Sequence, residues 1–392
     1  MVRWLLPFAV VGCGRIGFDP LDGLVVTRTD NRAEGGPALA SIAELPAEGL
    51  SLREAITIAN NHPGPDRITF DRDVFPVGAP AVIRIDRELE LDGDDTEVDG
   101  TSRGVQLDAA PGFSEKLLEV EGTGVTLRAL GFGAGGTKPR IVVEGDAATL
   151  VNLEFVGGPI AIKIENAADT KVADTNILTG SDIGISLEAT TGATLENVRI
   201  DRVIGDPIFA SNTSDLTIRA CTIVISDKTL GRGIRLENTS RSFILDNLVD
   251  PGPAQLISMQ DSSDNEIIGN VLDGGNVGIA LFGTSSRNLM FRNVIMGSTD
   301  EAMFVDATAV TNRILNTTLF NAAAISDSAP DTQIANTLDA TTGFVAPVTY
   351  DFRLVPGNPS IDQGTDLGLD MLPDSPERFL GAAPDLGAVE SF

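Results

Sequence analysis

The chain has 392 residues, of which 42% are hydrophobic but only 5% aromatic, so small aliphatic side chains must build most of its core. Such a composition favours many thin layers of strands. A formal net charge of −28 disfavours a nucleic-acid partner. The chain contains two cysteines, one of which directly follows an N-terminal export signal, so no intramolecular disulfide is expected to support the fold.

Residues 1–12 are typical of an export signal that is removed from the mature protein. Arg3 supplies the positive charge, and the apolar run that follows is far too short to span a bilayer. The stretch Val10–Cys13 resembles the lipobox of bacterial lipoproteins, which implies a lipid on Cys13 and a tether over residues 13–22. The expected location is the bacterial envelope, as an outer-membrane lipoprotein or a surface-exposed or secreted protein. A plain cleaved signal or a misassigned start are the alternatives.

Residues 23–75 are expected to form an N-terminal cap that contains a short helix. Ser51 and Glu54 have the spacing of a capping box, in which each side chain satisfies a backbone N–H at the start of a helix. Four apolar residues then fall on one helical face, namely Leu52, Ala55, Ile56 and Ala59. His62 lies in the Pro-Gly turn that ends this helix. Such a helix would cover the open end of a solenoid, where exposed strand edges invite aggregation.

Residues 76–325 carry an internal repeat of an alternating strand, a polar turn, an Asn and further aliphatics. The Asn position of the repeat is occupied by Asn152, Asn197, Cys221, Asn247, Asn270, Asn293 and Asn316. Its later steps are nearly equal, at about 23 residues each, a period too short for solenoids built of helical pairs. Strands of one unit can bury their inner faces only when units stack. The sequence therefore predicts an all-β fold, a single-stranded right-handed parallel β-helix of about 23 residues per coil.

The repeated Asn position favours a structural role. Asn tolerates left-handed turns, and stacked amides form hydrogen bonds from coil to coil as an internal ladder. Binding of sugar hydroxyls by this row is the weaker alternative. Cys221 occupies one rung and is expected to be a small buried residue rather than a nucleophile. Arg235, in another repeat, is expected to be an outward-facing strand residue.

Candidate catalytic residues are not recognisable in the sequence. His62 is the one histidine, so a serine triad or a zinc site is not credible. The one Trp belongs to residues 1–12 and Tyr350 is the one Tyr, whereas sugar-binding clefts usually use aromatic rings. The densest acidic stretch, with Asp92, Asp94, Asp95 and Asp99, is a weak candidate for Ca²⁺. The alternative is a solvated turn, and no other cofactor is expected.

Two motifs carry a family resemblance. The run Ser51–Ile56 resembles the bacterial domain named for a Cys-Ser-Leu-Arg-Glu-Ala-Ile motif, with Leu50 in place of the cysteine. Within residues 326–392, expected to form a C-terminal cap or tail, residues 351–362 and 385–390 resemble a choice-of-anchor type segment. This resemblance implies a secreted, pectate-lyase-like β-helix of the bacterial surface, in a family whose members mostly lack a defined activity. Leu50 removes any role of the family's thiol.

These observations favour a non-catalytic envelope scaffold that binds glycans or cell-surface partners, is held to the membrane by its lipid, and is monomeric. Parallel β-helices also cut polysaccharides, so a lyase or glycoside hydrolase acting in a groove is the first alternative. An architectural protein without a ligand is the second. A groove with three or more acids plus Arg or Lys within a few ångströms would favour the enzyme.

Overall fold

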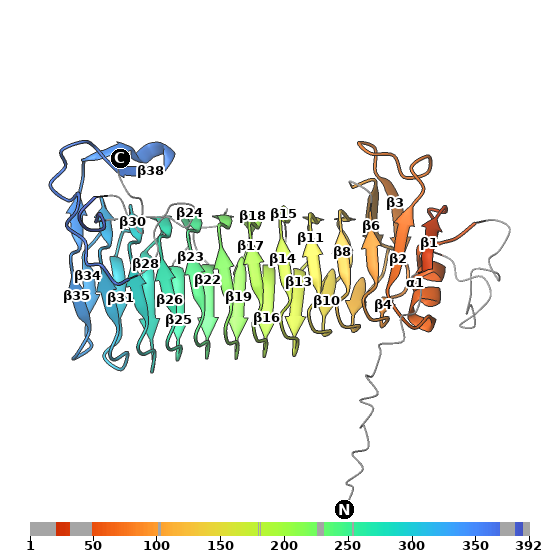
Figure 1. Cartoon of the computed structure of the whole chain (residues 1–392), viewed down its shortest axis with the longest axis horizontal. Coiled ribbons are helices and arrows are strands. Elements are labelled where there is room, and N and C mark those ends of the chain that lie inside the picture. Colours follow the sequence, from red (N-terminus) through yellow and green to blue (C-terminus); the bar gives the residue numbers. More distant parts are fainter. Residues whose placement is uncertain are drawn as a thin grey trace, which may run out of the picture.

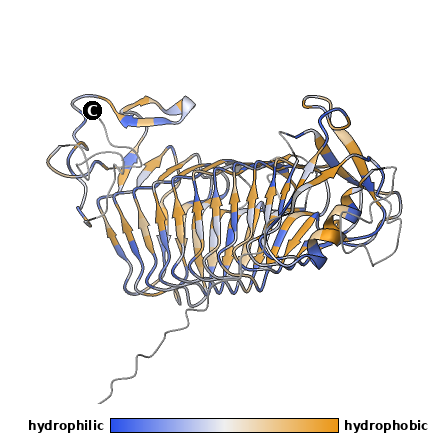
Figure 2. Cartoon of the chain, turned by 45° about the vertical axis from the view of Figure 1, so that its right-hand side comes forward, coloured by the Kyte–Doolittle hydropathy of each residue, from blue (hydrophilic) through white to orange (hydrophobic). Residues whose placement is uncertain are grey.

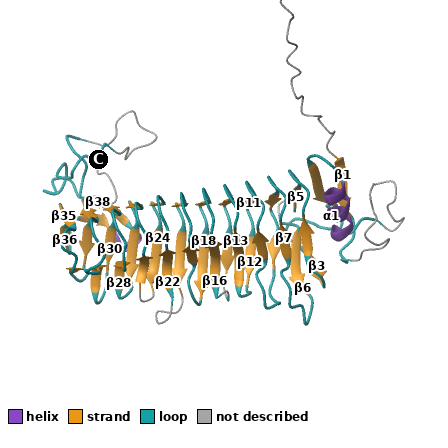
Figure 3. Cartoon of the chain, turned by 90° about the horizontal axis from the view of Figure 1, so that it is seen from below, coloured by secondary structure: helices purple, strands orange, loops and turns teal. Residues whose placement is uncertain are grey.

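The computed structural model describes residues 21–31, 49–100, 103–178, 180, 182–225, 231–252, 255–368 and 381–386. Within these residues the chain winds into a long parallel β-helix of about 11 turns, with roughly 23 residues per turn and one α-helix at one end (Figures 1 and 3). The all-β parallel solenoid predicted from the repeat is therefore confirmed. No helix in the described part of the chain is long and apolar enough to cross a membrane. Cys13 lies outside the described residues.

Each turn contributes one strand to each of three parallel sheets, which we name in the order in which the chain visits them. Sheet 1 contains, within the described residues, β1 (Leu21–Val26), β2 (Asp66–Phe70), β5 (Glu97–Asp99), β8 (Thr126–Arg128), β11 (Thr149–Val151), β14 (Lys171–Ala173), β17 (Thr194–Glu196), β20 (Thr217–Arg219), β23 (Phe243–Leu245), β26 (Glu266–Ile268), β29 (Leu289–Phe291), β32 (Arg313–Leu315) and β35 (Gln333–Ala335).

Sheet 2 follows each strand of sheet 1 after a short corner. Its described strands are β3 (Ala81–Ile85), β6 (Val105–Ala109), β9 (Gly131–Phe132), β12 (Glu154–Val156), β15 (Asn176–Leu178), β18 (Arg199–Val203), β21 (Thr222–Ile225), β24 (Leu248–Gly252), β27 (Val271–Gly274), β30 (Val294–Met296), β33 (Thr318–Phe320) and β36 (Leu338–Ala340).

Sheet 3 completes each turn. Its described strands are β4 (Leu89–Leu91), β7 (Leu118–Val120), β10 (Ile141–Val143), β13 (Ile160–Glu165), β16 (Ile183–Glu188), β19 (Ile208–Ser211), β22 (Arg232–Glu237), β25 (Gln255–Gln260), β28 (Val277–Phe282), β31 (Glu301–Val305) and β34 (Ile325–Asp327).

Alternation along the strands explains why the coil closes. In β13, Ile162 and Ile164 are fully buried, whereas Lys163 between them is partly exposed on the outer face. Hydrophobic residues predominate along the strands of the rod (Figure 2). The parallel register places Ile162 beside Ile185, and Ile185 beside Ile208, so inward aliphatics stack from turn to turn. This stacking buries a continuous apolar interior along the rod.

The stacked strands extend beyond both ends of the expected range 76–325. β1 and β2, within the segment expected to be an N-terminal cap, already belong to sheet 1. β35 and β36 continue sheets 1 and 2 within the segment expected to be a C-terminal tail. The repeat alone did not reveal them, because the helical segment separates β1 from β2 and the side chains of β35 are exposed.

The N-terminal helix α1 (Leu52–Asn61) forms as the capping box predicts. Ser51 accepts from the backbone of Glu54, and the Glu54 carboxylate accepts from the backbone of Ser51. The helix packs against β1, β2 and β4, and its buried face includes the four predicted apolar residues. His62 is the C-cap residue, as expected. The predicted helical cap is therefore confirmed.

The C-terminal segment folds back onto the outer face of sheet 2. The antiparallel strands β37 (Phe344–Ala346) and β38 (Asp351–Leu354) flank a short 3₁₀ helix, η3 (Pro347–Thr349). Phe344, Phe352 and Leu354 pack on Val294 and Phe320 in an apolar cluster separate from the main core. Tyr350 donates a hydrogen bond to Asp273 on β27 at 3.0 Å. The hairpin thus covers one end of the rod from the side (Figure 1).

Candidate functional site

The outer face of sheet 3 holds a row of side chains that combines an aromatic ring with charged groups. The parallel register places Ser186 beside Phe209, and Phe209 beside Arg235. Lys163 lies beside Ser186 on the preceding strand and forms ion pairs with Glu165 at 2.6 Å and Glu188 at 3.2 Å. Arg235 therefore faces outward, as the sequence indicated.

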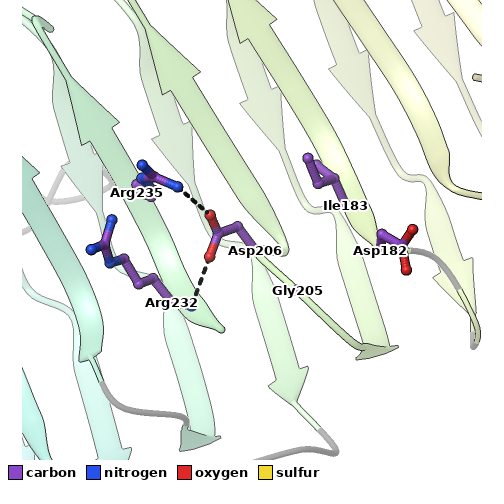
Figure 4. Close-up of a pocket in the computed structure, with 6 residues that line it drawn as sticks. All are labelled: Asp182, Ile183, Gly205, Asp206, Arg232 and Arg235. Atoms are coloured by element: carbon purple, nitrogen blue, oxygen red, sulfur yellow. Dashed lines mark hydrogen bonds and ion pairs between the residues drawn. The ribbon is translucent and has the colours of Figure 1, made fainter. Parts of the chain in front are cut away.

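A depression of about 400 Å³ lies beside this row, where the turns enter sheet 3 (Figure 4). It is lined by Asp182, Ile183, Gly205, Asp206, Arg232 and Arg235. Gly205 is required by the close stacking of the turns, since a Cβ atom there would lie 2.4 Å from the carbonyl oxygen of Asp182. The depression is therefore formed by three successive turns whose backbones pack tightly.

Arg235 organises the charges of this site. Asp206 accepts from the backbone N–H of Arg232 at 2.8 Å and from Nη1 of Arg235 at 3.1 Å. Nε of Arg235 donates to Glu237 at 2.8 Å, and its guanidinium lies 4.8 Å from the centre of the Phe209 ring. Burial disfavours the charged guanidinium, but the hydrogen bonds to Glu237 and Asp206 outweigh burial and raise the pKa of Arg235.

The chemistry of the depression is that of recognition. A guanidinium held by two carboxylates has its orientation fixed, and it stacks well on an aromatic ring. The resulting half-buried surface offers hydrogen-bond donors, acceptors and a flat apolar plate. Three acids, Asp182, Asp206 and Glu237, and two arginines lie around it, which partly meets the criterion set for an enzyme. However, Arg235 forms ion pairs with both Asp206 and Glu237, so both carboxylates already have a partner within the site.

A second group of charges lies at the N-terminal end of the same sheet. Carboxylate oxygens of Glu119, Glu121 and Glu144 lie within 4.8 Å of one another, and no other group of three or more possible ligands comes together in the described part of the chain. Lys116 contacts Glu119 and lies 3.6 Å from Glu88. Burial, followed by the charge of Glu119, raises the pKa of Glu88 to about 7. We refer to these five residues as the acidic cluster.

The acidic cluster was not predicted, although the sequence contains one signal that could have indicated it. Glu121 and Glu144 are separated by a single period of the repeat, so the stacking of turns makes them neighbours. Carboxylates at such distances could hold a hard cation or share a proton.

The four acids expected as a weak Ca²⁺ site do not converge. Asp94 accepts from the backbone N–H of Thr123 at 2.8 Å, and Asp99 pairs with Arg67 at 2.9 Å. Asp95 occupies a left-handed turn with φ of 55°. Asp92 is not part of any group of metal-ligating residues in the described structure. Each acid has a separate role, because the stretch runs through a turn and then enters β5, and this corrects the calcium assignment.

The Asn row divides between two adjacent positions at the corner between sheets 1 and 2. Asn152, Asn197 and Asn316 have positive φ and occupy the left-handed corner residue. The next position points inward and contains the buried side chains of Cys221, Asn247, Asn270 and Asn293. The step into Cys221 is 24 residues, whereas the 23-residue step out of Asn293 conceals a turn of 24 residues whose inward residue is Thr317. The expected single ladder is therefore corrected to one ladder and one row of turn residues.

The inward amides form the expected ladder. Asn247 donates to Oδ1 of Asn270 at 2.9 Å, and Asn270 donates to Oδ1 of Asn293 at 3.0 Å. The backbone N–H of Cys221 donates to Oδ1 of Asn247 at 2.9 Å. A second amide row at the corner between sheets 3 and 1 was missed, and it comprises Asn265, Asn288 and Asn312. These amides satisfy buried backbone groups and are not available to a ligand.

Cys221 is buried, with 1% of its surface exposed. Burial raises the pKa of its thiol to about 11, so the nucleophilic thiolate is scarce at neutral pH. This agrees with the interpretation of Cys221 as a small core residue.

Comparison with known proteins identifies the fold. The family described as right-handed β-helix region matches residues 141–319, which confirms the expected hand. No curated protein matches the chain. Among solved structures, the A-module of the Azotobacter vinelandii mannuronan C-5 epimerase AlgE6 superposes with a TM-score of 0.60 at 11% identity, covering 74% of this chain and 94% of that one.

Two further structures show the same fold. The periplasmic alginate epimerase AlgG has a TM-score of 0.55 at 11% identity and covers 70% of this chain and 83% of its own. The Dettilon tailspike protein has a TM-score of 0.52 at 13% identity, and the match covers 78% of this chain and 68% of the tailspike chain. The right-handed parallel β-helix expected from the family resemblance is thereby confirmed as a fold. A bacterial surface location and the family's terminal domains stay predictions.

Proposed function

We propose that this protein is a non-catalytic β-helix that binds a polysaccharide along the outer face of sheet 3. The observation that carries this proposal is the half-buried Phe209–Arg235 pair, with Asp206 and Glu237 on the same guanidinium. A ring and a fixed guanidinium offer a flat plate, and the carboxylates accept hydrogen bonds from hydroxyl groups. Two proteins of similar fold are alginate epimerases, which supports a glycan as the ligand class.

The geometry of sheet 3 suits a linear polymer. Its described strands run from β4 to β34, and ten intervals of roughly 4.8 Å give a face about 48 Å long. A repeating chain can contact equivalent positions on successive turns, because side chains on neighbouring strands lie in register.

The test is a screen of the full chain against neutral and acidic polysaccharides, with and without Ca²⁺, in which binding, reducing ends and unsaturated products are recorded together. We expect binding without product release. Phe209→Ala and Arg235→Ala should each weaken binding about tenfold or more, which is the scale of one lost stacking or charge-assisted contact. Phe243→Ala is the matched control, since Phe243 is 40% exposed on sheet 1. Equal loss in the control, or no binding at all, would favour an architectural protein without a ligand.

A polysaccharide lyase or glycoside hydrolase is the second candidate, and the acidic cluster is the observation that favours it. A carboxyl with a pKa of about 7, as at Glu88, is poised to give or take a proton at neutral pH. Products released by the wild type and lost in Glu88→Gln would replace the scaffold proposal with this one.

We also propose that Cys13 carries a lipid that holds the protein in the bacterial envelope, on the basis of the lipobox resemblance in the sequence. Metabolic labelling with palmitate should mark the wild type and leave Cys13→Ser unlabelled. Labelling of the mutant would contradict the anchor.

A further inference from the structure

Arg140 is a buried cation without a hydrogen-bonding partner for two of its nitrogen atoms. It immediately precedes β10, and only 1% of its surface is exposed. Its backbone is fixed on both sides, since its N–H donates to the carbonyl of Ile160 and its carbonyl accepts from Leu118. Its Nε and Nη2 atoms are buried and have no hydrogen-bond partner in the described part of the chain. A guanidinium is rarely left in this state, because it has five N–H donors and retains its charge.

The nearby groups compensate little of this charge. Burial lowers the pKa of Arg140, and the charge of Asp108 acts in the opposite direction. Asp108 itself accepts a hydrogen bond from Gln106 at 2.8 Å. An arginine that lacks hydrogen bonds in the interior carries a large desolvation penalty, so a purely structural role is better filled by an apolar side chain of similar volume.

Two glycines shape a slot for the guanidinium. Gly136 and Gly158 lie in consecutive turns with φ of 69° and 105°, conformations that side chains rarely adopt. A Cβ atom on Gly158 would lie 2.8 Å from Cζ of Arg140, and one on Gly136 would lie 2.9 Å from Nη1. Any other residue at either position would push the guanidinium away, so both turns are built around it.

The segment that leads from β9 to Arg140 is exposed and positively charged. Ala134, Gly135, Thr137 and Lys138 are exposed or half-buried. Lys138 is exposed and adds a positive charge in a chain whose net charge is −28. The turn also lies two turns from that of Asp182, about 10 Å along the same edge of sheet 3.

We propose that Arg140 is the base of an oxyanion site that accepts a carboxylate or sulfate group. The Nε–H and Nη2–H donors present the forked geometry that binds two oxygens of one planar or tetrahedral anion, and Lys138 adds a second positive charge. This proposal does not require that the protein binds a polysaccharide. A free anion presents the same oxygens to the site as an acidic group on a polymer.

The test is calorimetric titration of the full chain with sodium sulfate, with sodium glucuronate and with an oligomer of uronic acid residues. Glucose and sodium chloride at equal ionic strength serve as controls for the sugar and for salt. We expect saturable binding of one anion per chain, at least tenfold weaker in Arg140→Met. Arg128→Met is the matched control, since Arg128 lies exposed on β8 and pairs with Glu97. It should bind like the wild type. Binding of sulfate and glucuronate alike identifies a site for free anions, whereas binding of the oligomer alone identifies an acidic polymer as the source.

Thermal unfolding supplies a second measurement that does not depend on detecting heat. In a buffer without sulfate or carboxylate, Arg140→Met should unfold at the same temperature as the wild type or a higher one, and added sulfate should stabilise the wild type more than the variant. Arg140→Lys keeps the charge without the fork and should bind about tenfold more weakly. No saturable binding to the wild type, or equal anion binding by Arg140→Met, would overturn the proposal.

Discussion

The inward position at the corner between sheets 1 and 2 is filled in two different ways along one rod. In the N-terminal half it holds mostly apolar residues, namely Leu130, Leu153 and Val198 with Thr175 among them, whereas in the C-terminal half it holds Asn247 and Asn270, followed by Asn293. The backbone is the same in both halves, because the preceding residue is left-handed in each, with φ of 55° at Asn152 and 52° at Asp246. One corner geometry therefore accepts either an apolar or a hydrogen-bonded filling.

The two fillings stabilise the rod by different physics. The apolar half relies on packing, as in the stacked rings of Phe132 and Phe155, whose centroids lie 4.7 Å apart. In the amide half, Asn270 donates to the carbonyl of Ile244 and to Asn293, and accepts from both nitrogens of Asn247. Packing tolerates small changes, whereas a hydrogen-bond ladder leaves buried groups unsatisfied when one member is removed.

Removal of a central amide should lower the stability of the rod more than any other change considered below. Asn270→Ala strips hydrogen-bond partners from Asn247, Asn293 and the carbonyl of Ile244, so we expect it to lower the free energy of unfolding by about 4 kcal/mol. Urea unfolding followed by circular dichroism measures this loss. Asn197→Ala, in an exposed corner residue, is the control and should cost about 1 kcal/mol. Equal losses in both variants would contradict the ladder's role.

Removal of a large side chain from the apolar half should cost somewhat less. Leu153 is fully buried, so Leu153→Ala leaves a cavity and should lower the free energy of unfolding by about 3 kcal/mol. Leu153→Met, which conserves volume, should cost about 1 kcal/mol in the same urea experiment. A loss in Leu153→Met as large as that in Leu153→Ala would show that packing volume does not control this half.

Exchange of the two fillings sharpens the comparison. Val198→Asn places an amide beside Thr175 and Cys221, where no neighbouring Asn completes its hydrogen bonds, and we expect a loss of about 2 kcal/mol. Cys221→Asn instead extends the ladder by one rung onto Asn247 and should cost less than about 1 kcal/mol. The difference between the two variants in urea midpoint is the measured quantity, and its reversal would refute the interpretation.

The smallest expected effect is on the melting temperature. The outer surfaces of the two halves should differ in how this temperature responds to pH. The folded protein raises the pKa of Glu88 to about 7, from an ordinary value of 4.5, chiefly by burial. The stability contributed by this carboxyl is present below pH 4.5 and lost as the pH rises through about 7. The melting temperature of the wild type should therefore fall between pH 5 and 8 by roughly 2 °C relative to Glu88→Gln.

Asp264 in the C-terminal half provides the control for this pH response. The hydrogen bond from Arg287 lowers the pKa of Asp264, so this carboxyl stays ionised throughout the range from pH 5 to 8. Asp264→Asn should leave the pH dependence of the melting temperature unchanged. Parallel curves for the wild type and Glu88→Gln would contradict the role assigned to Glu88.

Local features of the fold could be predicted from the sequence, whereas the candidate sites depend on contacts between turns. The capping box at Ser51 involves neighbours in the chain, and the alternation in β13 requires one strand. The Phe209–Arg235 pair instead depends on the length of the turn before β22, which is longer than the turns that follow it. The error in the Asn row has the same origin, because a period fixes a turn but not a position within it. Arg140 gives no sequence signal, since its isolation is visible only when both glycine turns surround it.

The turns of the rod contact mainly their immediate neighbours. This arrangement has an evolutionary consequence. Duplication of one repeat unit would leave the hydrogen bonds of both flanking units intact and lengthen the rod by about 4.8 Å. Each such event would add one more outward strand to sheet 3 without redesigning the interior. The length of the outer face of sheet 3 thus becomes an inherited variable, set by how many copies of the repeat the chain carries.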